Sequence, residues 1–487
     1  MGSDIPPPTI AAIIRHAGER PGAAAVVNNG VATTYADLAR TIAGFAQALA
    51  ALGLRPGQTA AVQCGDQYLH LLLLLAAERS GIATASFVSG ELDRPLPLLA
   101  QVDLVLTELP ARISGARRIH AITKPWVEAT LALRSEAEEI APQSLDAPVR
   151  FQRTSGTTGF PKRILMRRRV HEARQSLWAE IDRMVPGDRA LIALPFTMGT
   201  SYSHASSALR AGATTVFDSR VELAEALTLH AITHIKMLPL QLRDLLERLP
   251  PDFVKPPRLV VATVGGRLAP HLRERLMTRL AVRLHEQYAS NEMGLVSEMI
   301  GDGPGAIGSI YPGVAVEIVD ADDKPVPHGQ SGRVRVKAET VVEAYLDDPE
   351  ATARMFRDGW FYPGDLGILH APGRLEVIGR EDDLLNIGGR KILPEELEDR
   401  IRERAAVGDV GVCALPNADG IDEVWVAVVY DAPDDRDIRI RLRPAFVDFI
   451  YGHAHLVKLA AVPRTATGKI KRADLRAAIL AAGKSGR

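Results

Sequence analysis

Helical and strand patterns alternate along most of the first 265 residues of this 487-residue chain. Residues 34–52 read as an amphipathic helix that Gly53 ends, and 60–64 follow as a buried strand. Further on, the same alternation gives strands at 190–194, 213–217, 232–237 and 258–264, with helices at 221–230 and 240–249. This alternation predicts an α/β fold in which helices cover parallel sheets.

The pattern of the sequence changes beyond Gly313. Residues 314–319 and 332–336 read as short alternating strands between Gly/Pro turns, which indicates a β-rich subdomain. The last unit mixes helices with strands and begins near Arg380. With 46% hydrophobic residues the chain can build a large core, but its length exceeds one compact domain. We therefore expect a large N-terminal domain over 1–379 and a small α+β C-terminal domain over 380–487.

The charge balance and the cysteines exclude several classes of protein. The 58 basic and 59 acidic residues give a formal net charge of -1, so no global field would recruit nucleic acid or an anionic membrane. Cys64 and Cys413 match no metal or redox spacing, and we expect two buried thiols. The longest apolar run, 71–77, is too short to cross a bilayer, and the N-terminus lacks a secretory pattern. We expect a cytoplasmic protein.

One glycine-rich segment, 153–162, has the composition of a phosphate-binding loop. Two glycines, four hydroxyls and Lys162 can direct backbone N–H groups, side-chain O–H groups and one cation toward phosphate oxygens. The spacing differs from the P-loop, and 163–166 read as a strand, which indicates a strand-loop-strand unit. Taken alone, the composition also fits an ordinary hairpin turn.

Five further segments accompany this loop. They are 286–292, 362–365, 379–383, 388–391 and 463–471. In this order and spacing, the six segments resemble those of the adenylate-forming superfamily, which includes acyl- and aryl-CoA synthetases, adenylation domains of peptide synthetases and luciferases. The resemblance extends from Thr34 to Lys469.

The resemblance implies a binding site for ATP and Mg²⁺. The loop would hold the phosphates through Thr154, Ser155, Gly156, Thr157, Thr158, Gly159 and Lys162. Purine, ribose and phosphate contacts would come from Gly266, Glu286, Gln287, Tyr288, Asn291, Asp365 and Arg380. In this scheme Tyr288 stacks on the purine, Glu286 accepts from its amino group, and Asp365 accepts from both ribose hydroxyls. Glu292 matches the Mg²⁺ ligand.

The resemblance also implies a mobile C-terminal domain. Lys469 matches the lysine that bridges the substrate carboxylate and the α-phosphate, so it would favour the anionic transition state. Asp382 matches the hinge, although a linker acid without a role fits as well. Gly388 and Gly389 would line the channel for the pantetheine arm of coenzyme A, where a bare backbone leaves room.

The substrate pocket is less well defined by the sequence. Candidate lining residues are Met198, His204, Lys236, Gly265 and Met293. No aspartate near Met198 is available to pair an α-ammonium, which favours a carboxylic acid with an uncharged tail. His204 also fits a packing role, and Lys236 fits either a partner for a polar group or a chain end in water.

Several positions depart from the family pattern. Arg163, Arg167 and Arg168 stand where the family has glycine and a Thr-His pair, and they fit either triphosphate contacts or a structural surface. Asn291 and Pro363 replace expected threonines.

Three functions are open at this point. The first is an ATP-dependent carboxylic acid:CoA ligase that acts through an acyl-adenylate. The second is an adenylating enzyme that loads an acyl carrier protein. The third is a non-catalytic sensor of nucleotide or acyl-AMP, against which the retained Lys162, Glu292, Asp365, Arg380 and Lys469 argue.

Overall fold

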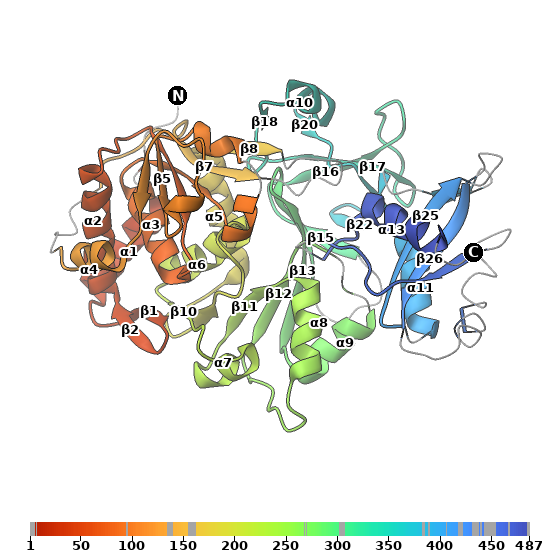
Figure 1. The fold of residues 1–487 in the computed structure, drawn as a ribbon, viewed down its shortest axis with the longest axis horizontal. Helices are drawn as coiled ribbons and strands as arrows, with labels where there is room; N and C mark the ends of the chain where they lie inside the picture. The colour runs from red at the N-terminus through yellow and green to blue at the C-terminus, as the bar shows by residue number, and fades with distance from the viewer. Residues whose placement is uncertain are drawn as a thin grey trace.

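A computed structural model describes residues 5, 7–93, 96–133, 140–153, 162–266, 268, 270–300, 307–381, 385–387, 390–405, 407–416, 422–430, 438, 441–442, 454–465 and 468–484. Figure 1 shows a body of helix-covered sheets, red through green to teal along the chain, and a smaller C-terminal unit in blue at the far end of the molecule. The predicted α/β class, with a large N-terminal and a small C-terminal part, is confirmed.

The first sheet has seven strands, in the order β18-β8-β7-β4-β3-β5-β6. Their bounds are β3 (Thr59–Gln63), β4 (Ala83–Ser86), β5 (Leu104–Thr107), β6 (Ile119–Ala121), β7 (Pro148–Arg153), β8 (Arg163–Arg167) and β18 (Tyr345–Leu346). Strands β3 to β7 are parallel, whereas β8 pairs antiparallel with β7 and β18. The predicted strand after the glycine-rich loop is therefore confirmed. The β7–β8 pair holds both ends of that loop.

The second sheet has fifteen strands, in the order β19-β20-β17-β21-β22-β15-β14-β13-β12-β11-β9-β10-β1-β2, with β16 on β17. Their bounds are β1 (Ala24–Asn28), β2 (Val31–Thr34), β9 (Arg189–Leu191), β10 (Thr214–Phe217), β11 (His234–Met237), β12 (Val260–Thr263), β13 (Arg283–Ser290), β14 (Gly294–Ile300), β15 (Ile307–Ile310), β16 (Ala315–Val319), β17 (Ser331–Lys337), β19 (Phe356–Arg357), β20 (Trp360–Phe361), β21 (Asp365–Ala371) and β22 (Arg374–Arg380). Strands β1, β10, β9, β11, β12 and β13 are parallel neighbours. From β13 onward the sheet is antiparallel, so the predicted β-rich part continues the large sheet.

Ten helices cover these sheets in the described part of the large domain. They are α1 (Pro8–Glu19), α2 (Tyr35–Ala51), α3 (Gln67–Arg79), α4 (Lys124–Leu131), α5 (Arg168–Asp182), α6 (Gly199–Ala211), α7 (Leu223–Leu229), α8 (Pro239–Arg248), α9 (Pro270–Arg279) and α10 (Pro349–Met355), with 3₁₀ turns at Ser89–Asp93, Pro97–Ala100 and Pro110–Arg112. Helix α2 begins after Thr34, whose hydroxyl oxygen accepts from the Asp37 N–H at 3.1 Å. Its buried side chains join a core formed with α1, α3 and α6. Each such Leu or Phe contributes roughly 1.5–3 kcal/mol when fully buried.

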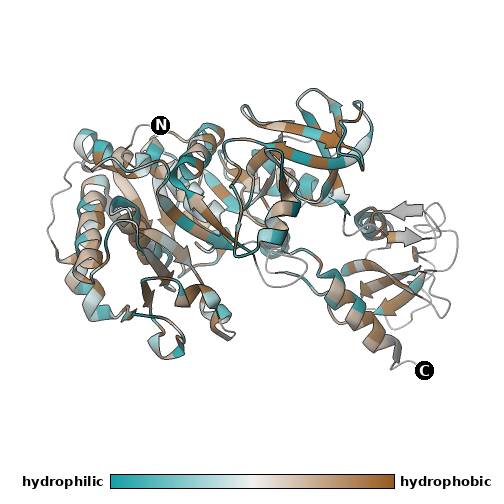
Figure 2. Ribbon diagram, turned by 90° about the horizontal axis from the view of Figure 1, so that it is seen from above, coloured by the Kyte–Doolittle hydropathy of each residue, from teal (hydrophilic) through white to brown (hydrophobic). Residues whose placement is uncertain are grey.

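The C-terminal unit has its own core. Its elements are β23 (Leu385–Ile387), β24 (Arg390–Ile392), α11 (Pro394–Ala405), β25 (Asp409–Pro416), β26 (Asp422–Val429), β27 (His455–Lys458) and α13 (Arg472–Lys484). Side chains alternate between the two faces of a strand. Accordingly, Val410 and Val412 of β25 pack with α11, whereas Cys413 and Leu415 pack with α13. Figure 2 shows these strands mostly in brown near the C-terminus, as expected for strands buried on both faces.

Two smaller expectations concern cysteines and membranes. Cys413 is buried, but Cys64 is only partly buried, so the expectation of two buried thiols is wrong for Cys64. Both residues are free thiols that form no disulfide. Within the described residues, every helix is too short or too polar to cross a bilayer.

Candidate active site

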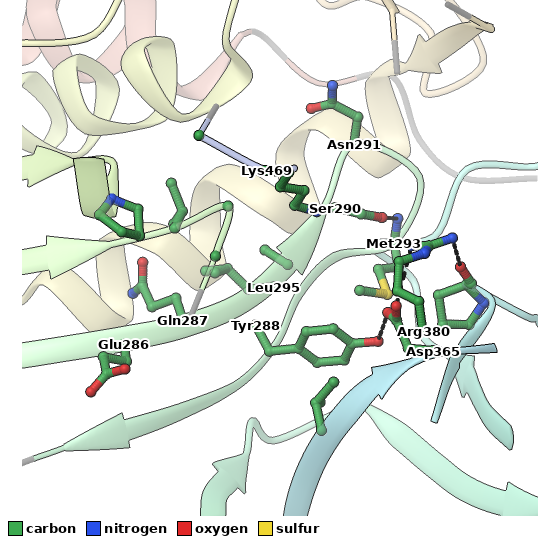
Figure 3. A pocket seen from close by; sticks show the side chains of 18 of the residues that line it. Glu286, Gln287, Tyr288, Ser290, Asn291, Met293, Leu295, Asp365, Arg380 and Lys469 are labelled. Carbon is green, nitrogen blue, oxygen red and sulfur yellow. Dashed lines mark hydrogen bonds and ion pairs between the residues drawn. The ribbon is translucent and has the colours of Figure 1, made fainter. Parts of the chain in front are cut away.

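A cleft of about 1560 Å³ is lined by residues of both the large domain and the C-terminal unit. Ten of the predicted nucleotide-binding and catalytic residues line it: Lys162, Gly266, Glu286, Gln287, Tyr288, Asn291, Glu292, Asp365, Arg380 and Lys469. Figure 3 shows several of them facing one another across the cleft. Strands and turns from distant parts of the sequence thus converge on one space.

The cleft follows the carboxyl ends of the parallel strands, where open α/β sheets usually bind ligands. Strand β12 ends at Thr263 and is followed by Gly265 and Gly266, while β13 continues to Ser290. Gly265 has φ of +88°, a conformation that favours glycine. A Cβ on Gly266 would meet only Pro239, at 3.5 Å, so the protein itself leaves space there.

Asp365 lies at the start of β21 and is held by two cleft residues. The Tyr288 hydroxyl donates to Oδ2 of Asp365, and the Arg380 guanidinium donates to Oδ1 at 3.2 Å (Figure 3). Burial raises the pKa of the Asp365 carboxyl, although Arg380 and Tyr288 oppose the rise. A carboxylate has about four lone-pair sites, so two remain for a ligand.

Glu292 presents its carboxylate to the same cleft. The Tyr345 hydroxyl donates to Glu292 Oε1 at 3.0 Å, which fixes the side chain. The Lys162 ammonium lies over the Tyr345 ring, 4.8 Å from its centroid. Tyr345 therefore contacts both the acid that follows β13 and the cation that precedes β8. A carboxylate oxygen is the donor type that Mg²⁺ prefers, so Glu292 fits as a ligand.

The backbone that carries Glu292 is held by a buried arginine. Arg174 of α5 donates to three carbonyl oxygens: Thr340 at 2.8 Å, Asn291 at 2.9 Å and Glu292 at 2.9 Å. In addition, the Asn291 amide donates to the Arg153 carbonyl at 2.8 Å, which ties this turn to the end of β7. The guanidinium thus satisfies one buried and two partly buried carbonyl oxygens.

Glu286 is engaged by protein groups. Its carboxylate pairs with Arg273, and the Leu268 N–H donates to it at 3.3 Å. The expected adenine contact of Glu286 would share these oxygens. Gln287 points to the opposite face of β13, where its amide donates to the Tyr311 hydroxyl at 3.5 Å.

Lys469 lies in a tight turn of the C-terminal unit. The Thr465 N–H donates to the Lys469 carbonyl at 2.7 Å, and Gly468 has φ of +85°. Arg464 fixes this turn, because it pairs with Asp409 at 2.6 Å and donates to the Gly468 carbonyl at 2.6 Å. The Lys469 side chain is exposed and lines the cleft (Figure 3), so its ammonium is available to a ligand.

The predicted substrate pocket needs a correction. Met198, Gly265 and Met293 line the large cleft, but His204 and Lys236 line a separate, much smaller pocket. Lys236 is buried, pairs with Asp182 at 2.8 Å and lies over the Trp178 ring. Its charge is therefore satisfied inside the protein, and its side chain does not end in water.

Three arginines after the loop are bound by protein groups. Arg163 pairs with Asp347, Arg167 pairs with Glu343 at 3.3 Å, and buried Arg168 donates to Glu172 at 3.2 Å. These contacts favour the structural interpretation of the three cations.

Several predicted residues lie outside the described residues. They are Thr154, Ser155, Gly156, Thr157, Thr158, Gly159, Asp382, Gly388 and Gly389. Conversely, the sequence did not predict roles for Arg174, Tyr345 and Arg273. A basic residue at a buried position of an amphipathic helix would have been a signal for Arg174, because a buried cation needs partners.

The chain is similar to known proteins over most of its length. The family model described as AMP-binding enzyme matches residues 13–346. The indoleacetate–CoA ligase of Aromatoleum aromaticum is 27% identical, over 95% of this chain and 96% of that protein. The fatty acid–[acyl-carrier-protein] ligase ScoC of Streptomyces coeruleorubidus is 28% identical, over 95% and 94%. The solved structure of ATP-bound MatB from Rhodopseudomonas palustris shares the fold, with a TM-score of 0.84 and 24% identity over 96% of this chain and 98% of MatB.

Proposed function

Because this chain belongs to the AMP-binding enzyme family of adenylate-forming acyl-CoA ligases, we propose that it is an ATP-dependent carboxylic acid:CoA ligase. The proposal depends on one observation above all: Lys469 of the C-terminal unit lines the same cleft as Lys162, Glu292 and Asp365. A site for transfer to phosphorus needs cations and positioned donors around the phosphates, and this cleft supplies them.

In the first half-reaction, Asp365 accepts hydrogen bonds from the ribose hydroxyls of ATP. Tyr288 and Arg380, which hold this carboxylate, keep it oriented. Lys162 and the loop hydroxyls hold the β- and γ-phosphates. Glu292 would hold Mg²⁺, which neutralises phosphate charge. The substrate carboxylate attacks the α-phosphorus, pyrophosphate leaves, and Lys469 stabilises the charge that develops.

In the second half-reaction, a thiol attacks the acyl carbonyl of the adenylate, and AMP leaves. The C-terminal unit, which we propose to turn about Asp382, then presents Gly388 and Gly389 to the pantetheine arm. A narrow channel with a bare backbone suits that arm.

The acceptor is proposed to be free coenzyme A, as in the name of the indoleacetate–CoA ligase relative. A second candidate is a carrier-protein pantetheine, because the ScoC relative is named as an acyl-carrier-protein ligase. Incubation with ATP, an acid and either CoA or a holo-carrier separates them: CoA should give the thioester faster. Faster acylation of the carrier would favour the second candidate.

Adenylation itself is tested by acid-dependent exchange of labelled pyrophosphate into ATP, over aryl, short-chain and medium-chain acids. Exchange with at least one acid supports the proposal. If binding of ATP and acids is detected without exchange, the non-catalytic sensor is the better description.

A further inference from the structure

Two polar side chains interrupt the buried face of β7, just before the phosphate loop. Arg150 and Gln152 are two residues apart, so they lie on one face of the strand, opposite to Val149 and Phe151. They are only 6% and 9% exposed. Strands inside helix-covered parallel sheets are normally apolar on both faces. A break in this pattern points to a function.

Helices α3, α5 and α6 surround these residues with further charge. The Arg150 guanidinium lies over the Tyr202 ring, 3.6 Å from its centroid, and its Nη2 is 3.6 Å from Glu78 Oε2. On the same helices, Glu172 pairs with Arg168 at 3.2 Å and Arg210 at 3.0 Å. All of these groups except Arg210 are at least nine-tenths buried.

This cluster carries a surplus of positive charge. Three guanidiniums face two carboxylates, those of Glu78 and Glu172. Burial, with the charge of Glu78, raises the pKa of Glu172 to about 7, which reduces the negative charge near neutral pH. Burial lowers the pKa of His171 to about 4, so its ring is neutral. Glu78, His171 and Glu172 have the spacing of a metal site, but the guanidiniums would repel a cation.

Some residues of the cluster that line the cleft carry buried polar atoms without a hydrogen bond. Four cleft-lining residues have buried atoms that make no hydrogen bond in the structure: Arg150 (Nε, Nη2), Gln152 (Oε1), His171 (both ring nitrogens) and Gln175 (Oε1). Arg150 Nη2 and His171 Nε2 each lie 3.6 Å from Glu78 Oε2, which is an ion-pair distance longer than a hydrogen bond. Buried polar groups are normally hydrogen-bonded, so these atoms indicate a binding site for a polar ligand. Nε and Nη2 of Arg150 form one edge of the guanidinium, which matches the two oxygens of a carboxylate.

We propose that this end of the cleft binds a second carboxylate, carried at the far end of the acyl substrate, and that Arg150 is the specificity-determining residue. The proposal rests on the adenylating function proposed above and narrows its substrate class to dicarboxylic acids. Arg150 would bind the distal carboxylate through Nε and Nη2. The amides of Gln152 and Gln175 can turn their NH₂ groups toward the same anion. The reacting carboxylate stays at the Lys469 end.

The test compares matched acids by initial rates of acid-dependent pyrophosphate release. Each α,ω-dicarboxylic acid of three to eight carbons is paired with the monocarboxylic acid of equal length, and terephthalate is paired with 4-methylbenzoate. We expect kcat/KM to favour one dicarboxylate over its partner by about tenfold to a hundredfold, as for loss of a charge-assisted pair. Equal or better use of the monocarboxylates would overturn the inference.

Variants of β7 provide the second arm. Arg150→Met should reduce the dicarboxylate-to-monocarboxylate ratio of kcat/KM about tenfold or more, and Arg150→Lys should reduce it less. Since Arg150→Met leaves Glu78 without this partner, Gln152→Leu is the second probe, because it breaks no ion pair. An unchanged ratio in Gln152→Leu and in the folded Arg150 variants would refute the assignment. If no acid at all supports exchange, the adenylating function fails first, and the two failures are thus distinguishable.

Discussion

The substitution Tyr345→Phe tests how the proposed Mg²⁺ ligand is oriented. It removes only the hydroxyl that donates to Glu292 at 3.0 Å. The ring remains for the Lys162 ammonium at 4.8 Å and for the edge contact with Phe356, whose centroid is 5.4 Å away. A hydrogen bond to a charged group is worth about 1.5–3 kcal/mol, and partners of metal ligands typically change metal affinity or activity about 10- to 100-fold.

We therefore expect Tyr345→Phe to lower kcat/KM for ATP about tenfold at limiting Mg²⁺, with partial recovery at high Mg²⁺. The assay is acid-dependent pyrophosphate release over a Mg²⁺ titration. Tyr35→Phe is the matched control, because it also loses a buried hydroxyl hydrogen bond, to Ala213 at 2.7 Å, but lies outside the cleft. An unchanged Mg²⁺ dependence in Tyr345→Phe, with Glu292→Gln inactive, would refute the orienting role.

Three further predictions concern stability and binding. Arg174→Met should lower the free energy of unfolding by about 3–5 kcal/mol, because one buried and two partly buried carbonyls lose their donor; urea denaturation measures this, and a loss below 1 kcal/mol would contradict it. Burial lowers the pKa of Lys236 from 10.5 to about 8, so the unfolded chain binds more protons between these values and stability should rise with pH there. The free energy of unfolding of the wild-type protein, relative to that of Lys236→Met/Asp182→Leu, should thus rise by roughly 1–2 kcal/mol from pH 7.5 to 9.5. A difference between the two proteins that does not change with pH would contradict the burial argument. Because burial raises the pKa of Asp365, its carboxylate should take up a proton at a pH above the usual aspartate range, and ATP affinity should fall as the pH is lowered through that point. Asp365→Asn should bind ATP weakly at every pH. Titration calorimetry measures both affinities.

The fold was largely predictable from the sequence, because hydrophobic periodicity identifies buried elements directly. The strand expected at 258–264 is present as β12, and the helix expected at 240–249 is present as α8. The order of the strands at the end of the large sheet was harder to predict, since β14 to β22 pair across turns and insertions that no local pattern specifies. Hydrophobic periodicity indicates which side of a single segment is buried, whereas strand pairing depends on two segments at once.

The candidate site was predictable where several residues act in one segment. Tyr288 and Glu292 share a strand and the turn after it, so one motif pointed to both. Arg174 and Tyr345 were not predicted, because each contacts a segment more than 50 residues away in the sequence. Lys236 was placed wrongly for the same reason: its partner, Asp182, is 54 residues away and could not be paired with it from sequence.

We propose that the ammonium of Lys469 acts in adenylation. Lys469→Ala is best compared with Lys471→Ala, which lies two residues further on, pairs with Asp474 at 3.5 Å and does not line the cleft. Acid-dependent exchange of pyrophosphate into ATP should fall about 10²- to 10³-fold in Lys469→Ala only, whereas thioester formation from supplied acyl-AMP continues. Equal exchange in the two variants, or equal loss of both half-reactions in Lys469→Ala, would contradict the account.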